Sequence, residues 1–240
     1  MNATGPTSEP FGSELDRARR VYAGVATTSG SGIYDPLRAT SLFRLQEREW
    51  TLAALLRRAG VHTLSGIDIL EVGCGSGGAL RRLVALGAEP ARMAGIDLMD
   101  ARIDAARELL PQAEFQVGSA HNLPFGDASF DVVMQATLFS SVVDPDLQMA
   151  IAAEMVRVLR PSGVIVWYDM HRVAPSSNIV PMRVDRIHAL FRGARIEVRS
   201  VTLRWWLGQR VPRISRAIAL ALQQLPLCCS HYLAVIRPRP

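Results

Sequence analysis

The sequence predicts an α/β domain built on a mostly parallel β-sheet that is covered by helices on both faces. From residue 67 onward, short β-branched apolar runs alternate with helical patterns, which is typical of such a sheet. The first run leads into Gly73, Gly75, Gly77 and Gly78, and glycine lets a backbone turn approach a ligand closely. At 240 residues and 49% hydrophobic composition, the chain is long enough for one sizeable globular domain.

The N-terminal residues are expected to lie outside this sheet. Residues 1–12 are rich in Gly, Pro, Ser and Thr, a composition typical of a disordered tail. Residues 13–22 have the pattern of a short capped helix, and residues 39–59 carry the apolar spacing of a longer one. We therefore divide the chain into a tail with a helical lid, residues 1–60, and a ligand-binding domain, residues 61–240. A plain packing extension is the alternative to a lid.

Seven strands and the helices between them follow from the apolar patterns of the remaining residues. The strands are expected at residues 67–72, 92–97, 113–117, 130–136, 163–169, 195–202 and 231–237. The helices are expected at residues 76–87, 101–110, 145–159, 181–192 and 207–225. Ligands of open α/β sheets bind beyond the carboxyl ends of the strands, so the residues just after each strand are the candidates for a site.

Every strongly basic side chain of the sequence is an arginine. The net charge is +5 and the sequence contains no lysine, which excludes a lysine Schiff base, a lysine general base and a P-loop lysine. Nine arginines lie between Arg183 and Arg216, against only Asp185 and Glu197. Nucleic-acid binding is one interpretation of this run. A solvated helix face or a site for an anionic substrate is favoured, and a nucleic-acid partner is not expected.

Other features bear on the compartment and on metals. No apolar run reaches the ~18 residues of a membrane span, and the N-terminus lacks the basic and apolar regions of a signal peptide. Cys74, Cys228 and Cys229 lack metal-ligand spacing and are expected to be reduced thiols. We therefore expect a cytoplasmic protein with no membrane partner and no metal site.

The glycine turn is compatible with two kinds of cofactor. Gly73-x-Gly75-x-x-Gly78 fits the dinucleotide-binding fingerprint, and Asp97 ends the second strand where an acidic residue accepts hydrogen bonds from ribose hydroxyls. A nicotinamide-dependent oxidoreductase is therefore one interpretation. Glu71 argues against it, because a carboxylate beside the turn is unfavourable for an anionic pyrophosphate and favourable for a sulfonium or ammonium.

Three further blocks sharpen the choice. Residues 118–125 follow the third strand, residues 129–135 form the fourth, and residues 155–169 lead through Arg-Pro-Ser-Gly into the fifth. Together with the Gly-Cys-Gly-Ser-Gly turn, and in this order, they resemble the class I S-adenosylmethionine-dependent methyltransferases over residues 67–170. The part that follows is similar, more weakly, to the C-terminal part of bacterial small-molecule and glycan methyltransferases.

The resemblance implies a Rossmann-like three-layer sandwich with a seven-stranded, mostly parallel sheet whose last strand is antiparallel. It also implies S-adenosyl-L-methionine as cofactor. The implied contacts are Glu71, Gly73, Cys74 and Gly75 at the methionine moiety, Asp97 at the ribose hydroxyls, Leu98, Ala120 and His121 at the adenine, and Gln135 at the methionine amino group. Ser119 stands where the family often has an acidic residue at the adenine amino group, so that contact is expected to be weaker or to come from the backbone.

Methyl transfer from a sulfonium needs a positioned nucleophile and, for some acceptors, a base. His171 and Asp169 follow the fifth strand and are the candidate base or acceptor anchor and its orienting partner. Tyr22 and Arg44 belong to the expected lid and are candidates for contacts with the cofactor carboxylate or the acceptor.

These observations predict methyl transfer to an oxygen or nitrogen atom of a small molecule, in specialised metabolism or glycan decoration. Fold does not decide the reaction. An enzyme of this fold can instead cyclise the aminobutyrate chain of S-adenosylmethionine and release methylthioadenosine. An RNA-binding module and a nicotinamide-dependent oxidoreductase are the further alternatives.

Overall fold

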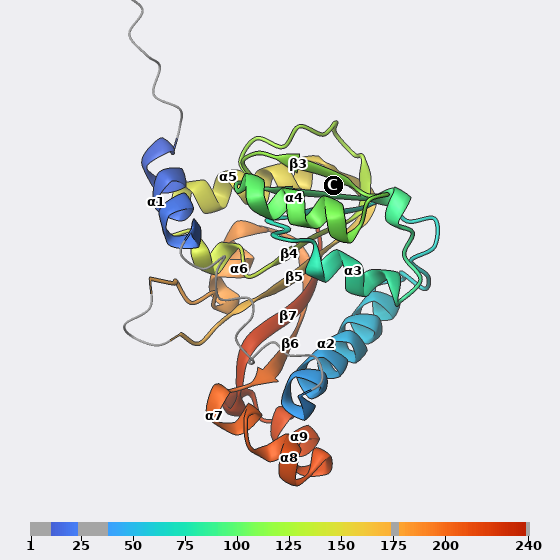
Figure 1. The fold of residues 1–240 in the computed structure, drawn as a ribbon, viewed down its shortest axis with the longest axis vertical. Helices are drawn as coiled ribbons and strands as arrows, with labels where there is room; N and C mark the ends of the chain where they lie inside the picture. Colours follow the sequence, from blue (N-terminus) through green and yellow to red (C-terminus); the bar gives the residue numbers. More distant parts are fainter. Residues whose placement is uncertain (1–10, 24–37, 174–177, 239–240) are drawn as a thin grey trace, which may run out of the picture.

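The computed structural model describes residues 11–23, 38–173 and 178–238, and a seven-stranded β-sheet runs through it (Figure 1). The strands are β1 (Ile69–Val72), β2 (Met93–Asp97), β3 (Glu114–Val117), β4 (Phe130–Ala136), β5 (Leu159–Met170), β6 (Arg195–Leu203) and β7 (Cys229–Arg237). Their order across the sheet is β3-β2-β1-β4-β5-β7-β6. The disorder expected for the N-terminal tail falls almost wholly outside the described residues.

The strand directions confirm the predicted fold. β1 pairs in parallel with β2 and β4, as does β2 with β3 and β4 with β5. Only β7 runs antiparallel, to both β5 and β6, so the last strand has the expected direction. Because the chain moves outward from β1 through β2 to β3 and then returns to β4 on the other side, the carboxyl ends of β1 and β4 border the switch point where ligands bind.

Helices cover both faces of the sheet. They are α1 (Gly12–Ala23), α2 (Ala39–Arg58), α3 (Gly78–Val84), α4 (Asp100–Leu109), α5 (Pro145–Arg157), α6 (Val184–Leu190), α7 (Trp205–Gly208), α8 (Val211–Ile214) and α9 (Arg216–Gln223). Buried side chains of α1, α5 and α6 join the core that contains Leu70, and those of α2, α3 and α4 join the core that contains Ile69. Since successive residues of a strand point to opposite faces, β1 contributes to both cores.

Several predicted helices are shorter in the structure, among them the one expected at residues 181–192, which is α6. The helix expected at residues 76–87 begins only at Gly78, because Gly77 has a φ of 75°, in the left-handed region that a helix does not use. The helix expected at residues 207–225 is divided into α7, α8 and α9. Ser215, with an extended backbone, separates the last two and accepts a hydrogen bond from the backbone N–H of Ile218, which caps α9.

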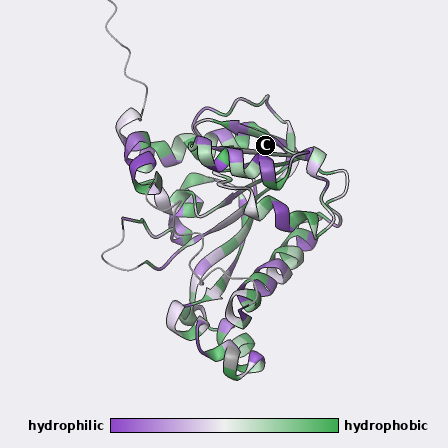
Figure 2. Ribbon diagram, viewed as in Figure 1, coloured by the Kyte–Doolittle hydropathy of each residue, from purple (hydrophilic) through white to green (hydrophobic). Residues whose placement is uncertain are grey.

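The two N-terminal helices pack on the domain. α2 lies against β6 and β7, and buries Leu52, Leu55 and Leu56 there. The buried carboxylate of Glu47 accepts a hydrogen bond from the backbone N–H of Thr202, with 3.1 Å from the nitrogen to each oxygen, which ties α2 to β6. Both helices carry hydrophobic and hydrophilic residues along their length (Figure 2), as expected of helices with one buried face. None of the described helices has the length and apolar character needed to cross a bilayer.

Candidate active site

The glycine turn after β1 has a backbone that other residues adopt poorly. Gly73, Gly75 and Gly77 have φ values of 71°, 51° and 75°, all in the left-handed region. The backbone N–H groups of Gly73 and Cys74 donate to the carbonyl of Ile96, at 2.8 and 3.0 Å, which holds the start of the turn against β2. The turn is therefore fixed by the backbone; Gly73 and Gly75 are partly exposed, whereas Gly77 is buried and packs closely against Ala106 and Phe115.

Asp97 connects this turn to the end of β2. Its Oδ2 accepts a hydrogen bond from the N–H of Gly75 at 2.9 Å, and its Oδ1 accepts one from the N–H of Met99 at 3.1 Å. The carboxylate thereby stays in one orientation while it borders a cavity of about 120 Å³. The predicted residues that line this first cavity are Tyr22, Gly73, Asp97, Leu98, Ser119 and Ala120.

A second, larger cavity of about 440 Å³ lies on the other side of the glycine turn. The predicted residues in its wall are Arg44, Glu71, Gly73, Cys74 and Gly75. Gly73, Arg102, Ala136 and Thr137 line both cavities, so the two form one groove across the carboxyl ends of β1 and β4. The groove is at the switch point of the sheet, where this class of fold binds ligands.

Glu71 is the most unusual group in the groove. Its side chain is only 2% exposed, and its Oε2 has no hydrogen-bond partner in the part of the chain that the structure describes. Burial raises the pKa of this carboxyl to about 8. An ammonium group placed here would supply the missing partner and favour the carboxylate form. Glu71 and the open glycine turn therefore fit the methionine end of S-adenosylmethionine.

Two of the predicted cofactor residues lie behind the wall of the groove. Gln135 is fully buried in β4, where its Oε1 accepts a hydrogen bond from the N–H of Leu138 at 2.9 Å. Its Nε2 has no partner among the described residues. His121 has its Nδ1 2.6 Å from the hydroxyl of Ser119, and its ring meets the ring of Phe11 edge to face. Both residues hydrogen-bond to residues that line the first cavity, Leu138 and Ser119, and line neither cavity themselves.

The N-terminal helices form walls of the groove. Tyr22 of α1 hydrogen-bonds through its hydroxyl to Ser141, and the guanidinium of Arg102 lies over its ring, 4.6 Å from the ring centre. Arg44 of α2 lines the second cavity. α1 therefore borders the first cavity and α2 the second, so each half of the groove has one wall from outside the sheet.

The two residues predicted to be catalytic, Asp169 and His171, line neither cavity of the groove. Asp169 is fully buried, and its Oδ2 accepts from the backbone N–H of Ser140 at 3.1 Å while its Oδ1 accepts from Met170 at 2.8 Å. Burial raises its pKa to about 6. Its sequence neighbour Tyr168 faces the groove instead, because adjacent residues of β5 point to opposite faces.

His171 lies in a separate hollow, which Arg172, Arg183 and Tyr232 also line. Its ring stacks on Tyr232 with 3.9 Å between ring centres, and its buried Nε2 has no partner among the described residues. Burial lowers the pKa of His171 to about 4, so the ring is neutral near pH 7. It lines neither of the two cavities that form the groove.

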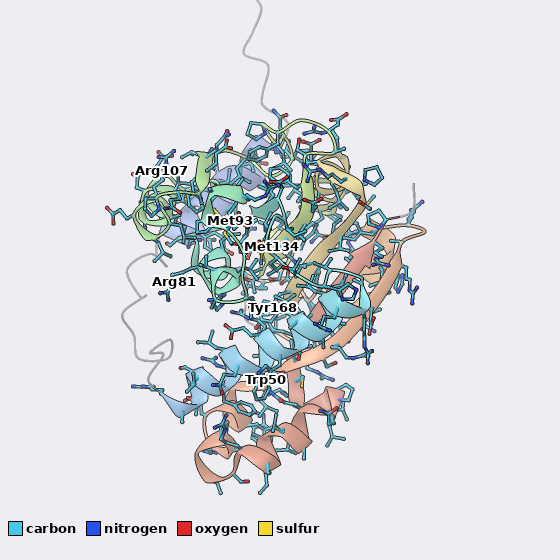
Figure 3. The ribbon with its side chains drawn as sticks, turned by 90° about the vertical axis from the view of Figure 1, so that its right-hand side faces the viewer. Trp50, Arg81, Met93, Arg107, Met134 and Tyr168 are labelled. Atoms are coloured by element: carbon cyan, nitrogen blue, oxygen red, sulfur yellow. The ribbon has the colours of Figure 1, made fainter. Side chains whose placement is uncertain are left out.

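A cluster of side chains that the sequence did not predict lines the second cavity. The ring of Tyr168 stacks on that of His231 with 4.8 Å between centres, and the guanidinium of Arg48 lies 4.9 Å from the Tyr168 ring centre. The Tyr168 hydroxyl is 2.9 Å from that of Thr202. Figure 3 shows Tyr168 in the middle of the molecule beside α2. His231 comes from the antiparallel β7, so only the sheet pairing brings it to Tyr168.

Arginine gives this cavity a cationic wall. Arg44, Arg48 and Arg82 all line it. Burial and the neighbouring Arg48 lower the pKa of Arg82 to about 10. Neither Arg48 nor Arg82 forms an ion pair within 4.0 Å with a carboxylate among the described residues. Two neighbouring guanidinium groups at a partly buried site favour a bound anion.

Comparisons with known proteins agree with this geometry. Residues 69–163 match the family model of a methyltransferase domain. A phthiotriol/phenolphthiotriol dimycocerosates methyltransferase of Mycobacterium ulcerans is 39% identical over 134 residues, which are 55% of this chain and 47% of that protein. The chain spans about half the length of the curated relatives it matches.

Solved structures share the fold at low identity. The PH0226 protein of Pyrococcus horikoshii is 20% identical with a TM-score of 0.63, over 91% of this chain and 99% of that one. A SAM-dependent methyltransferase of Aquifex aeolicus is 15% identical with a TM-score of 0.57, over 93% and 98%. With the glycine turn, Asp97 and Glu71 in place, residues 69–163 are similar to a methyltransferase domain, and the groove fits S-adenosyl-L-methionine.

Proposed function

We propose that this protein transfers the methyl group of S-adenosylmethionine to an oxygen or nitrogen atom of a small-molecule acceptor. The observation that carries the proposal is the groove of two cavities that meet at Gly73, with Asp97 bordering one cavity and Glu71 the other. One cavity suits the adenosine and the other the methionine end with room for an acceptor.

The residues of the groove would bind the cofactor along its length. Asp97 would accept hydrogen bonds from both ribose hydroxyls, with Leu98 and Ala120 beside the adenine. Glu71 would bind the ammonium, and the sulfonium would lie beside Gly73, where the cavities meet. These are the roles that the family motif implies at matching positions.

The bound cofactor supplies an activated methyl group whose leaving group is a neutral thioether. The protein's contribution is to hold the acceptor's lone pair in line with that methyl group and to exclude water. The acceptor loses one proton overall, so S-adenosylhomocysteine, the methylated acceptor and a proton are the products. His231 lies in the second cavity and burial lowers its pKa to about 3, so it is a neutral hydrogen-bonding group and a poor base.

The acceptor would lie in the second cavity beyond the methionine end. Tyr168, Thr202 and His231 offer it an aromatic stack and hydroxyl groups, and the arginines favour an acceptor or a cofactor group with negative charge. The curated relatives are named as methyltransferases of phthiotriol and phenolphthiotriol dimycocerosates, which supports an acceptor that is neither a protein nor a nucleic acid.

Product analysis tests the proposal. The purified protein is incubated with methyl-labelled S-adenosylmethionine, first alone and then with a fractionated metabolite extract. We expect label in a small-molecule fraction together with an equal amount of S-adenosylhomocysteine. Release of methylthioadenosine from the cofactor alone would indicate internal cyclisation instead. Salt-sensitive binding to RNA without turnover would indicate a nucleic-acid-binding module.

A further inference from the structure

One end of the molecule is built from three short helices that follow β6. α7, α8 and α9 lie together beyond the ends of β6 and β7 and beside the start of α2 (Figure 1). We call residues 204–228 the C-terminal tip. Phe43 of α2, Leu203, Leu207 and Ala219 form a small separate core that fixes the tip to the domain.

The tip has an unusual number of exposed apolar side chains. Six of its large apolar residues are more than half exposed, and among the described residues outside the tip only Trp50 is as exposed. The six are Trp205, Trp206, Ile214, Ile218, Leu225 and Leu227, with 59, 54, 80, 52, 53 and 71% exposure. Scattered single residues of this kind are normal, whereas a group of them on contiguous short helices marks an interaction surface.

The same surface carries only positive charge. Arg204, Arg210 and Arg216 of the tip are exposed, and no aspartate or glutamate occurs after Glu197 in the sequence. Tryptophan together with aliphatic residues and arginine is the composition of segments that lie in the headgroup region of a bilayer. Anionic lipid headgroups attract basic residues near the surface, so the charge and the apolar residues act in the same direction.

We propose that the C-terminal tip docks on the surface of a membrane that contains anionic phospholipid. A second copy of the chain fits this surface less well, because it would bring the arginines of two tips together. RNA fits it less well because four of the six exposed apolar residues are aliphatic and offer no ring for base stacking. The proposal departs from the expectation of no membrane partner because these apolar side chains are exposed on the tip.

Docking would place the second cavity close to the lipid surface. Thr202, in the wall of that cavity, lies three residues before Trp205 in the sequence. Ser41 and Arg44 of α2 also line the cavity, and Phe43 between them packs in the core of the tip. An acceptor that partitions into the membrane would therefore have a short path to the groove. The docking itself does not depend on the proposed methyl transfer.

Vesicle co-sedimentation of the full chain tests the proposal. Vesicles of phosphatidylcholine alone are compared with vesicles of phosphatidylcholine and phosphatidylglycerol, at about 0.1 M salt, where charges within ~10 Å still interact. We expect the protein to pellet with the anionic vesicles and to be released at high salt. The double variant Arg204→Gln/Arg210→Gln should bind about 30-fold more weakly, since each basic residue near such a surface contributes about fivefold.

Tryptophan variants separate insertion from simple charge attraction. Trp205→Ala/Trp206→Ala should lose vesicle binding, while Trp50→Ala, which removes an equally exposed tryptophan from α2, should keep it. Circular dichroism and S-adenosylhomocysteine binding of all variants check that they fold. The proposal is overturned if the protein binds neither kind of vesicle. It is also overturned if Trp50→Ala loses as much vesicle binding as Trp205→Ala/Trp206→Ala. A protein dimer that Trp205→Ala/Trp206→Ala abolishes, without vesicle binding, would assign the tip to a second copy instead.

Discussion

Replacing Asp97 with alanine should weaken the binding of S-adenosylhomocysteine by about 10²- to 10⁴-fold. The carboxylate is held by the N–H groups of Gly75 and Met99, at 2.9 and 3.1 Å, and would accept two ribose hydroxyls. A hydrogen bond to a charged group contributes about 1.5–3 kcal/mol, so the loss of two costs about 3–6 kcal/mol. Isothermal titration calorimetry with S-adenosylhomocysteine and with methylthioadenosine measures the change. Both ligands carry the ribose, so both should weaken.

A matched variant separates this effect from a general loss of charge. Asp104 lies on α4 with an exposed side chain that pairs only with Arg107, at 3.1 Å, among the described residues. Asp104→Ala should leave both affinities unchanged. Thermal unfolding of Asp97→Ala shows how much stability the glycine turn loses with its two backbone contacts. If Asp97→Ala binds S-adenosylhomocysteine as tightly as the Asp104→Ala protein, the assignment of Asp97 to the ribose is refuted.

Three further predictions concern other groups. Arg82→Gln should weaken S-adenosylhomocysteine binding by about 10- to 100-fold and spare methylthioadenosine, which lacks the carboxylate. Arg81 is exposed and points outward in Figure 3, so Arg81→Gln is the control. Equal loss of affinity for both ligands in Arg82→Gln would argue against an anion site. Burial raises the pKa of Glu71 to about 8, so binding of the ammonium at pH 7 should release about one proton. Affinity should then rise with pH up to about 8, and calorimetry in two buffers should find no release for Glu71→Gln. His171→Ala should leave S-adenosylhomocysteine affinity unchanged because His171 lies outside the groove, and a tenfold loss would show that its hollow communicates with the site.

The sequence alone determined the part of the site that is local in the chain. The left-handed backbone at Gly73, Gly75 and Gly77 is a property of residues that directly follow one strand, and glycine is the residue that adopts it. Asp97 was predicted because it ends the next strand, and the carboxyl ends of neighbouring parallel strands meet at one edge. The seven strands and the direction of the last one followed from the same alternation and from the family resemblance.

The second cavity depended on contacts between distant parts of the chain. Tyr168, His231 and Arg48 come from β5, β7 and α2, and meet because β7 pairs antiparallel to β5 while α2 packs across both. The positions of Asp169 and His171 outside the groove have the same origin. The position of a residue at a strand end shows that it lies near the edge of the sheet. The face to which its side chain points depends on the register of β5, and a shift of one residue along the strand moves the side chain to the opposite face.

The C-terminal tip was likewise decided by tertiary structure. The sequence shows Trp205, Trp206 and a series of aliphatic residues with helical spacing, a pattern that a buried helix shares. Their exposure follows from the division of that segment into three short helices, which place Leu207 and Ala219 in the small core with Phe43 and Leu203. Sequence fixes which residues are apolar, whereas the packing of the neighbouring elements fixes which of them remain in contact with solvent.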